Sequence, residues 1–138
     1  MRVSQKSDYA FRAMLELAIR SNQKQPVRSA EIARNRQIPE KFLEMILVEL
    51  RRSGLIISQR GPVGGHRLAR TPNEITVGDI WRAIDGTFAE TSNAPSTDPL
   101  SFVWREVDRG ISKVVDRITL ADIQKRAESQ EGAPDFSI

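Results

Sequence analysis

The chain has 138 residues, of which 28% are charged and 39% apolar, with one histidine and no cysteine, a size typical of one compact domain with an accessory element. The lack of cysteine excludes disulfides, thiolate catalysis and cysteine-ligated zinc or iron–sulfur sites, and we predict no metal site and no cofactor. No apolar run approaches the roughly 20 residues of a membrane span, and no secretory signal is evident, so we expect a soluble, cytoplasmic protein.

The charge is unevenly distributed along the chain. Residues 1–70 carry 14 Lys and Arg against 6 Asp and Glu, a net charge of +8, whereas residues 71–138 carry 7 against 12, a net charge of −5. Clustered basic residues bind polyanions because phosphates release their counterions. The first half therefore favours double-stranded DNA as a partner, and a solvated basic surface is the alternative.

Apolar residues recur at three- and four-residue spacing in three early segments, which predicts helices over 7–19, 30–36 and 39–52. Ser29 is expected to cap the second helix, and Pro39 to occupy the first position of the third. Gly54 is well placed just past the end of the third helix.

A β-hairpin follows, with strands predicted over 55–58 and 66–69 and a connection rich in glycine. Thr76 and Asp79 then form a capping-box pattern that opens a helix ending at Gly86. Helix, extended piece, helix, turn, helix and hairpin, in that order, is typical of a winged helix-turn-helix.

The rest of the chain is expected to hold a polar loop and then a long helix. The apolar residues of that helix are spaced as in a narrow seam that packs against another helix: Leu100, Val103, Val107, Ile111, Val114 and Ile118. A second, shorter helix is predicted after a capping box at Thr119. The fold class is thus mainly α with a small β-hairpin wing: a winged helix-turn-helix over 1–86, a loop over 87–98, dimerisation helices over 99–128 and a flexible tail over 129–138.

A helix-turn-helix places the start of its second helix in the major groove, which brings six residues closest to the bases: Pro39, Glu40, Lys41, Phe42, Glu44 and Met45. Lys41 suits guanine acceptors, Glu44 a cytosine amine, and Met45 a thymine methyl. For Phe42 we favour core packing over base contact, and for Glu44 a solvated helix charge is an equal alternative. Phosphates, which position the protein without specifying sequence, are expected to meet Arg28, Ser29, Arg51 and Arg52.

The hairpin connection suits a wing that approaches DNA. Arg60 is the strongest single candidate, because an arginine at such a tip can enter a narrow minor groove. Gly61, Gly64 and Gly65 let the backbone come close to a phosphate. His66 is interpreted as a packing or phosphate-contacting residue, with a metal ligand as the weaker alternative.

Seven segments of the chain resemble the IscR/NsrR/CymR family of bacterial regulators: YAFRAM (9–14), IPEKFLE (38–44), LRRSGL (50–55), RGPVGGHRLAR (60–70), ITVGDI (75–80), AIDG (83–86) and ITLADI (118–123). The resemblance implies a homodimeric winged-helix transcription factor whose long helices cross between subunits on a palindromic operator. It carries the family's recognition-helix contacts onto Pro39, Lys41, Phe42, Glu44 and Met45, and its wing arginine onto Arg60. Two departures stand in the wing, with Val63 where relatives commonly have glycine and His66 where they commonly have tyrosine.

The resemblance also locates the loop in which sensing members hold an iron–sulfur cluster through three cysteines, here residues 87–104. This chain has no cysteine. Asp98 and Ser101 stand where the iron–sulfur regulator has a cysteine and a nearby histidine, and Asp8 matches an acidic cluster ligand of some relatives. The resemblance therefore implies a member without the cluster.

We predict a sequence-specific DNA-binding regulator and not an enzyme, since no nucleophile has an identifiable base. The leading hypothesis is a homodimeric repressor controlled by a small-molecule effector or a protein partner. An effector crevice is possible near Trp81, Phe88, Phe102 and Trp104, with core packing as the favoured explanation of these aromatics. The alternative function is a winged-helix protein-interaction module.

Overall fold

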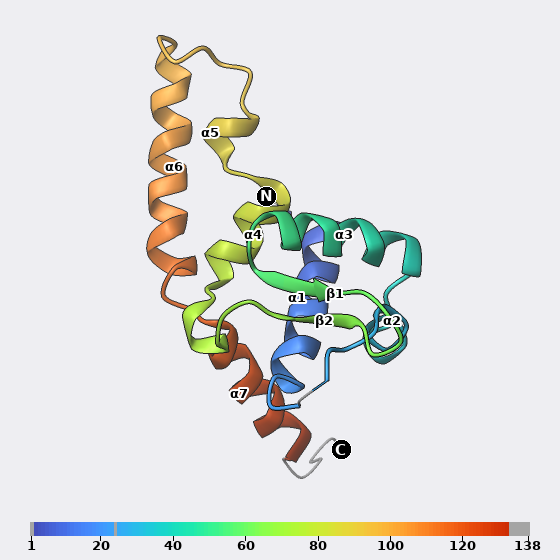
Figure 1. Cartoon of the computed structure of the whole chain (residues 1–138). Helices are drawn as coiled ribbons and strands as arrows, with labels where there is room; N and C mark the ends of the chain where they lie inside the picture. The colour runs from blue at the N-terminus through green and yellow to red at the C-terminus, as the bar shows by residue number, and fades with distance from the viewer. Residues whose placement is uncertain (1, 24, 133–138) are drawn as a thin grey trace.

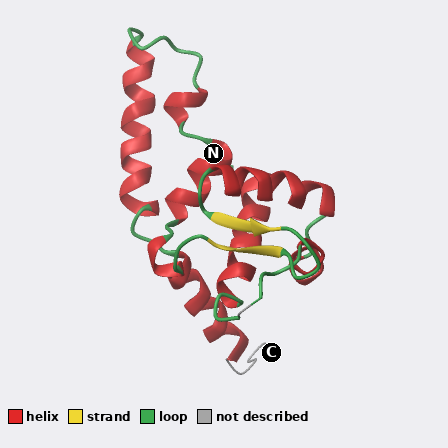
Figure 2. Ribbon diagram, viewed as in Figure 1, coloured by secondary structure: helices red, strands yellow, loops and turns green. Residues whose placement is uncertain are grey.

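A computed structural model describes residues 2–23 and 25–132 and shows a helical protein with one two-stranded antiparallel sheet (Figures 1 and 2). The elements in chain order are α1 (Gln5–Ile19), α2 (Ser29–Arg36), α3 (Glu40–Arg52), β1 (Ile56–Gln59), β2 (Gly65–Leu68), η1 (Pro72–Glu74), α4 (Val77–Asp85), α5 (Phe88–Thr91), α6 (Pro99–Val115) and α7 (Leu120–Gly132). This confirms the predicted class of a mainly helical protein with a β-hairpin. No helix among the described residues is both long enough and apolar enough to cross a membrane.

Helix α1 runs through the centre of the molecule and contacts α2, α3, α4, α7 and β2. Its buried face includes Met14 and Leu17, which belong to the same core cluster as Leu43 and Leu50 of α3 and Leu120 of α7. Full burial of each such side chain stabilises the fold by roughly 1.5–3 kcal/mol. One core therefore holds the hairpin and the helices around α1, and it fixes the orientation of α3.

Two capping boxes bring the starts of α4 and α7 together. The hydroxyls of Thr76 and Thr119 accept from the backbone N–H of Asp79 and Asp122, and each aspartate accepts from the N–H of its threonine. The segments before the two helices also pair as a β-bridge, in which Val77 N–H donates to the Ile118 carbonyl at 2.8 Å. Both predicted caps are confirmed.

Helix α6 stands away from the hairpin and core, beside α5 (Figure 1). The carboxylate of Asp108 accepts from the backbone N–H groups of Phe88 and Ala89 at 2.7 and 2.8 Å, which ties α5 to α6. Arg82 of α4 donates to Asp116, just past the end of α6, at 2.6 Å. The position of α6 is thus set by α4 and α5.

Several boundaries differ from the sequence prediction. The expected loop over 87–98 contains the single-turn helix α5, and both strands start one residue to the side of the predicted ranges. Ile118 lies beyond the end of α6, so the predicted seam is shorter than expected. Helix α7 continues to Gly132, so residues 129–132 are helical, and the rest of the predicted tail, 133–138, lies outside the described residues.

Candidate nucleic-acid interface

The unit α2–turn–α3 presents one face of α3 outward. Gln37 adopts a left-handed conformation (φ 54°) between the two helices, and Ile38 is buried and donates to the Ala33 carbonyl at 3.0 Å. Pro39 is the residue before α3 and not its first helical position. Because Leu43, Ile46 and Leu50 are buried, the opposite side of α3 faces solvent.

All eight predicted contacts of the α3 segment lie on the exposed side: Pro39, Glu40, Lys41, Phe42, Glu44, Met45, Arg51 and Arg52. Met45 is 54% exposed. The core interpretation of Phe42 is wrong, since its side chain is 45% exposed and lies at the surface with its ring centroid 6.0 Å from that of Tyr9. The face thus carries a mixture of charged, thioether and aromatic groups, which can meet the varied edges of base pairs.

The hairpin forms the wing, which we define as β1, β2 and the loop 60–64. Strand register pairs Ser58 with His66 and Gln59 with Gly65. Gly64 and Gly65 are required sterically, because an added Cβ would lie 2.3 Å from the Gln59 carbonyl oxygen and 2.6 Å from that of Val27. Arg60 and Gly61 are exposed in the loop.

The wing is fastened to the segment that leads into α2. Val27 and His66 exchange two backbone hydrogen bonds, at 2.9 and 2.7 Å. The Arg28 guanidinium donates to the carbonyl of Pro62 in the wing loop. Arg28 therefore supports the wing, a role that was not predicted for it.

His66 joins three parts of this surface through its ring. Its Nε2 lies 3.0 Å from the Ser29 hydroxyl, and its Nδ1 lies 2.8 Å from the Ser58 hydroxyl. Ser29 is consequently not the cap of α2, which is Arg28 and makes no side-chain cap bond. Burial lowers the pKa of His66 below its usual value of 6.5, with the Glu44 carboxylate opposing the shift and the Arg51 guanidinium adding to it.

A surface hollow of about 350 Å³ lies between the wing and the start of α2 and is lined by residues of both. Its lining residues include Arg28, Ser29, Gly61, Gly64 and His66. With Gly65, which also lines the hollow, six of the predicted contacts are thereby brought together. Ser58 and Val27 were missed by sequence reasoning, although the register of the hairpin places Ser58 directly opposite His66 and was the available signal.

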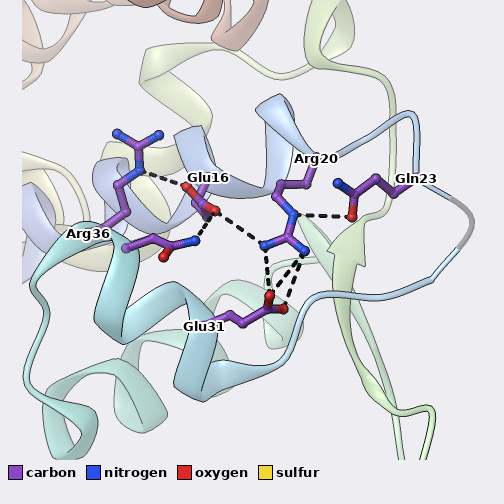
Figure 3. Close-up of polar contacts among 6 residues, drawn as sticks. Glu16, Arg20, Gln23, Glu31 and Arg36 are labelled. Atoms are coloured by element: carbon purple, nitrogen blue, oxygen red, sulfur yellow. Dashed lines mark hydrogen bonds and ion pairs between the residues drawn. The ribbon is translucent and has the colours of Figure 1, made fainter.

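The orientation of α2 depends on an ion-pair network beneath it (Figure 3). Glu16 of α1 is only 4% exposed, and its carboxylate accepts from Asn35 at 3.0 Å and from Arg36 at 2.9 Å. Arg20 lies 3.6 Å from Glu16 and 3.3 Å from Glu31 of α2. A buried carboxylate with several donors holds the two helices in one arrangement.

The predicted seam of α6 is largely exposed. Leu100, Val103 and Val114 are 55%, 43% and 51% exposed, and Ile118, beyond the helix, is 39% exposed. Gly110 lies among them, with no atom within 4 Å of an added Cβ. This is an apolar stripe on the side of the helix that no other described element covers.

The aromatics proposed for an effector crevice do not form one site. Phe88 and Trp104 stack with centroids 6.3 Å apart, whereas Phe102 is 61% exposed. The cavity between α4, α5 and α6, lined in part by Trp81 and Phe88, has a volume of about 30 Å³. That is room for about one water molecule, so packing between helices fits Trp81, Phe88 and Trp104 better, whereas the core interpretation is wrong for Phe102.

Comparison with known proteins places this geometry in context. A family model described as Rrf2, iron-dependent transcriptional regulator, matches residues 3–126. The chain is 34% identical to IscR of Vibrio atlanticus, over 95% of this chain and 79% of that protein. It is 30% identical to CymR of Bacillus subtilis, with both chains covered completely.

Solved structures agree with the sequence comparison. The structure of T. potens IscR is similar with a TM-score of 0.77 and 38% identity, covering 99% of this chain and 95% of that one. The structure of CymR, described as the global cysteine regulator of B. subtilis, has a TM-score of 0.73 and 30% identity, covering 91% and 98%. The similarity extends over the wing and the long helix alike.

Proposed function

Because the chain belongs to the Rrf2 family of DNA-binding transcriptional regulators, we propose that it acts as a homodimeric repressor that binds a palindromic operator without an iron–sulfur cluster. The observation that carries the proposal is the joint exposure of the α3 face and the wing on the basic half of the chain. Lys41, Glu44 and Met45 read bases in the major groove, and Arg60 enters the adjacent minor groove. Phosphates meet Arg51, Arg52 and the backbone of Gly61 and Gly64.

The apolar stripe of α6 supports a second copy of the chain as its cover. Large exposed apolar surfaces rimmed by charge are typical of protein interfaces. Glu106 and Lys113 lie at nearly equal distances along the chain from Gly110, so a two-fold axis close to that residue puts Glu106 of one copy beside Lys113 of the other. Opposite charges at such positions set the register of an antiparallel helix pair. Gly110 itself lets the second backbone approach closely.

A cluster-free mechanism is supported by the residues that replace the family's ligands. The chain has no cysteine. Asp98 accepts from the Leu100 N–H at 2.8 Å, and the Ser101 hydroxyl donates to the Asp98 carbonyl at 2.8 Å. Asp8 pairs with Arg12 at 2.9 Å. These oxygen groups serve their own helix turns and do not fit a cluster that is normally held by thiolates.

The experiment that tests the proposal is selection of fragmented genomic DNA by the purified, metal-free protein, with a salt titration on each enriched fragment. We expect a two-fold symmetric site with half-sites about one helical turn or a multiple apart. Binding that depends on salt but not on DNA sequence would contradict the proposed operator. It would favour the alternative function, a protein-interaction module. Overlap of the enriched site with a promoter, followed by reduced transcription in vitro, tests repression.

A further inference from the structure

The ring of His66 lies between the wing and the start of α2. His66 is the one histidine of the chain, and histidine is the side chain whose ordinary pKa brings its charge change near neutral pH. Its ring connects Ser29, at the start of α2, to Ser58 of β1, while its backbone pairs with Val27. The residue therefore lies where the wing meets the helix-turn-helix.

Protonation of this ring changes which groups can donate to an incoming anion. A neutral imidazole has one donor and one acceptor, so one of the two serine hydroxyls must give its hydrogen to the ring. A protonated ring donates from both nitrogens, and that hydroxyl hydrogen becomes available to another acceptor. Both hydrogen bonds persist in both states, so the wing stays in place while one positive charge and one donor are added.

Burial keeps the ring of His66 largely neutral in the free protein at pH 7, because it lowers the pKa of the imidazole. Burial lowers the pKa of His66 most strongly, Arg51 of α3 lowers it further, and Glu44 of α3 raises it. Arg28 lines the same hollow, and a second hollow on the other side of His66 is lined by four more charged residues: Arg20, Arg67, Arg70 and Glu74. Of the two side chains whose charge shifts the pKa of His66, Glu44 has the larger effect and favours the protonated ring, so the lowering comes mainly from burial.

DNA bound as proposed above would raise the pKa of His66 again. Backbone phosphates over the wing and the start of α2 place negative charge near the ring and offset the neighbouring guanidinium groups. We infer that His66 couples DNA binding by this surface to proton uptake at its ring, so that the operator is bound more tightly in mildly acidic conditions. The inference rests on the proposed function, because it needs DNA on this face.

The sign of the effect follows from linkage. Since phosphate raises the pKa of His66 in the complex above that in the free protein, affinity rises as pH falls through the range between the two values and levels off below the lower one. Each unit of separation gives about tenfold in affinity. We expect binding about threefold tighter per wing, and about tenfold for a dimer, at about pH 5.5 than at about pH 8.

The test measures the dissociation constant across this pH range at fixed salt, for the wild type and for His66→Gln. Glutamine keeps a donor and an acceptor but carries no charge in either condition. The wild type should show the pH-dependent gain, and His66→Gln should show a nearly flat profile, whatever its absolute affinity. Equal slopes for the two proteins would overturn the inference, because the titrating group would then lie elsewhere.

A second measurement does not depend on the folding of any variant. The ring protons of the single histidine give one set of NMR signals, which can be titrated in the free wild type and in its complex with the selected duplex, or with a mixed-sequence duplex at low salt. A higher pKa in the complex supports the inference, and an equal or lower one overturns it. Loss of sequence preference at every pH would instead count against the proposed function, so the two failures are distinguishable.

Discussion

The carboxylate of Glu16 on α1 accepts a hydrogen bond from the guanidinium of Arg36 in the last turn of α2, at 2.9 Å, with the glutamate side chain 5% and the arginine side chain 22% exposed. Figure 3 shows the same carboxylate directed at Arg20 as well. Helix α2, the first helix of the helix-turn-helix, is thus held to α1 by the Glu16 carboxylate, which is almost completely buried. Removing Glu16 would take a buried partner from both Arg36 and Arg20, although Arg20 keeps its ion pair with Glu31.

Glu16→Ala should lower the free energy of unfolding by about 3 kcal/mol, because Arg36 and Arg20 lose a buried partner. Glu16→Gln retains an acceptor and should cost less. Urea denaturation provides the measurement, and Asp8→Ala is the matched control, since its ion pair with Arg12 is about half exposed and is worth less than about 1 kcal/mol. Similar losses in the two alanine variants would show that burial of the network contributes nothing.

Arg60→Ala should weaken operator binding by on the order of tenfold or more without changing the unfolding temperature, because the side chain is exposed and an arginine in a narrow minor groove contributes both charge and shape recognition. The slope of log affinity against log salt should also fall by about one per wing. Fluorescence anisotropy at several salt concentrations gives both quantities. Arg126→Ala, an equally basic and exposed position on α7, should leave them unchanged.

Glu44→Ala should alter which base pair is preferred at one operator position more than it alters overall affinity. A carboxylate that accepts from a cytosine amine discriminates against the wrong base by roughly 1–3 kcal/mol, and its removal also takes a negative charge away from the phosphates. Repeating the DNA selection with the variant measures the preference. An unchanged consensus would identify Glu44 as a solvated helix charge that makes no base contact.

Val114→Glu should convert the proposed dimer into a monomer, because each new carboxylate would be buried among the apolar side chains of the α6 interface. Sedimentation velocity measures the change, and operator affinity should fall with it as the two half-sites are no longer bound together. Val3→Glu is a suitable control, since Val3 is 63% exposed and lies outside α6. A variant of Val114 that remains dimeric would place the interface elsewhere.

Local patterns in the sequence were sufficient to locate most helices and the hairpin. The capping boxes at Thr76 and Thr119 and the apolar spacing of α1 and α3 depend only on neighbours in the chain, so they predicted those elements correctly. Helix α5 is a single turn that owes its position to Asp108, twenty residues away from Phe88, so the local sequence alone predicted a loop there.

The sequence predicted some features of the candidate interface correctly and others wrongly. The errors again arose where a side chain's position depends on residues far away in the chain. The exposed positions of α3 follow from helical periodicity. The Ser29 hydroxyl, in contrast, had two possible uses, and the contact with His66 displaced the expected cap because the wing folds back against α2. Core packing was favoured over base contact for Phe42, and only the tertiary arrangement, with the inner side of α3 already filled by Leu43 and Ile46, leaves it at the surface.

The β-bridge between Thr76 and Thr119 determines where the chain can tolerate insertions and deletions during evolution. The chain leaves the core at the end of α4 and returns to it at that bridge. Helices α5 and α6 therefore form an insertion whose two ends are both fixed to the core. Lengthening or shortening the connection over 92–98 alters loop entropy only slowly with length and leaves the recognition helix where it is. The segment that carries α5 and α6 can therefore change in length without moving α3.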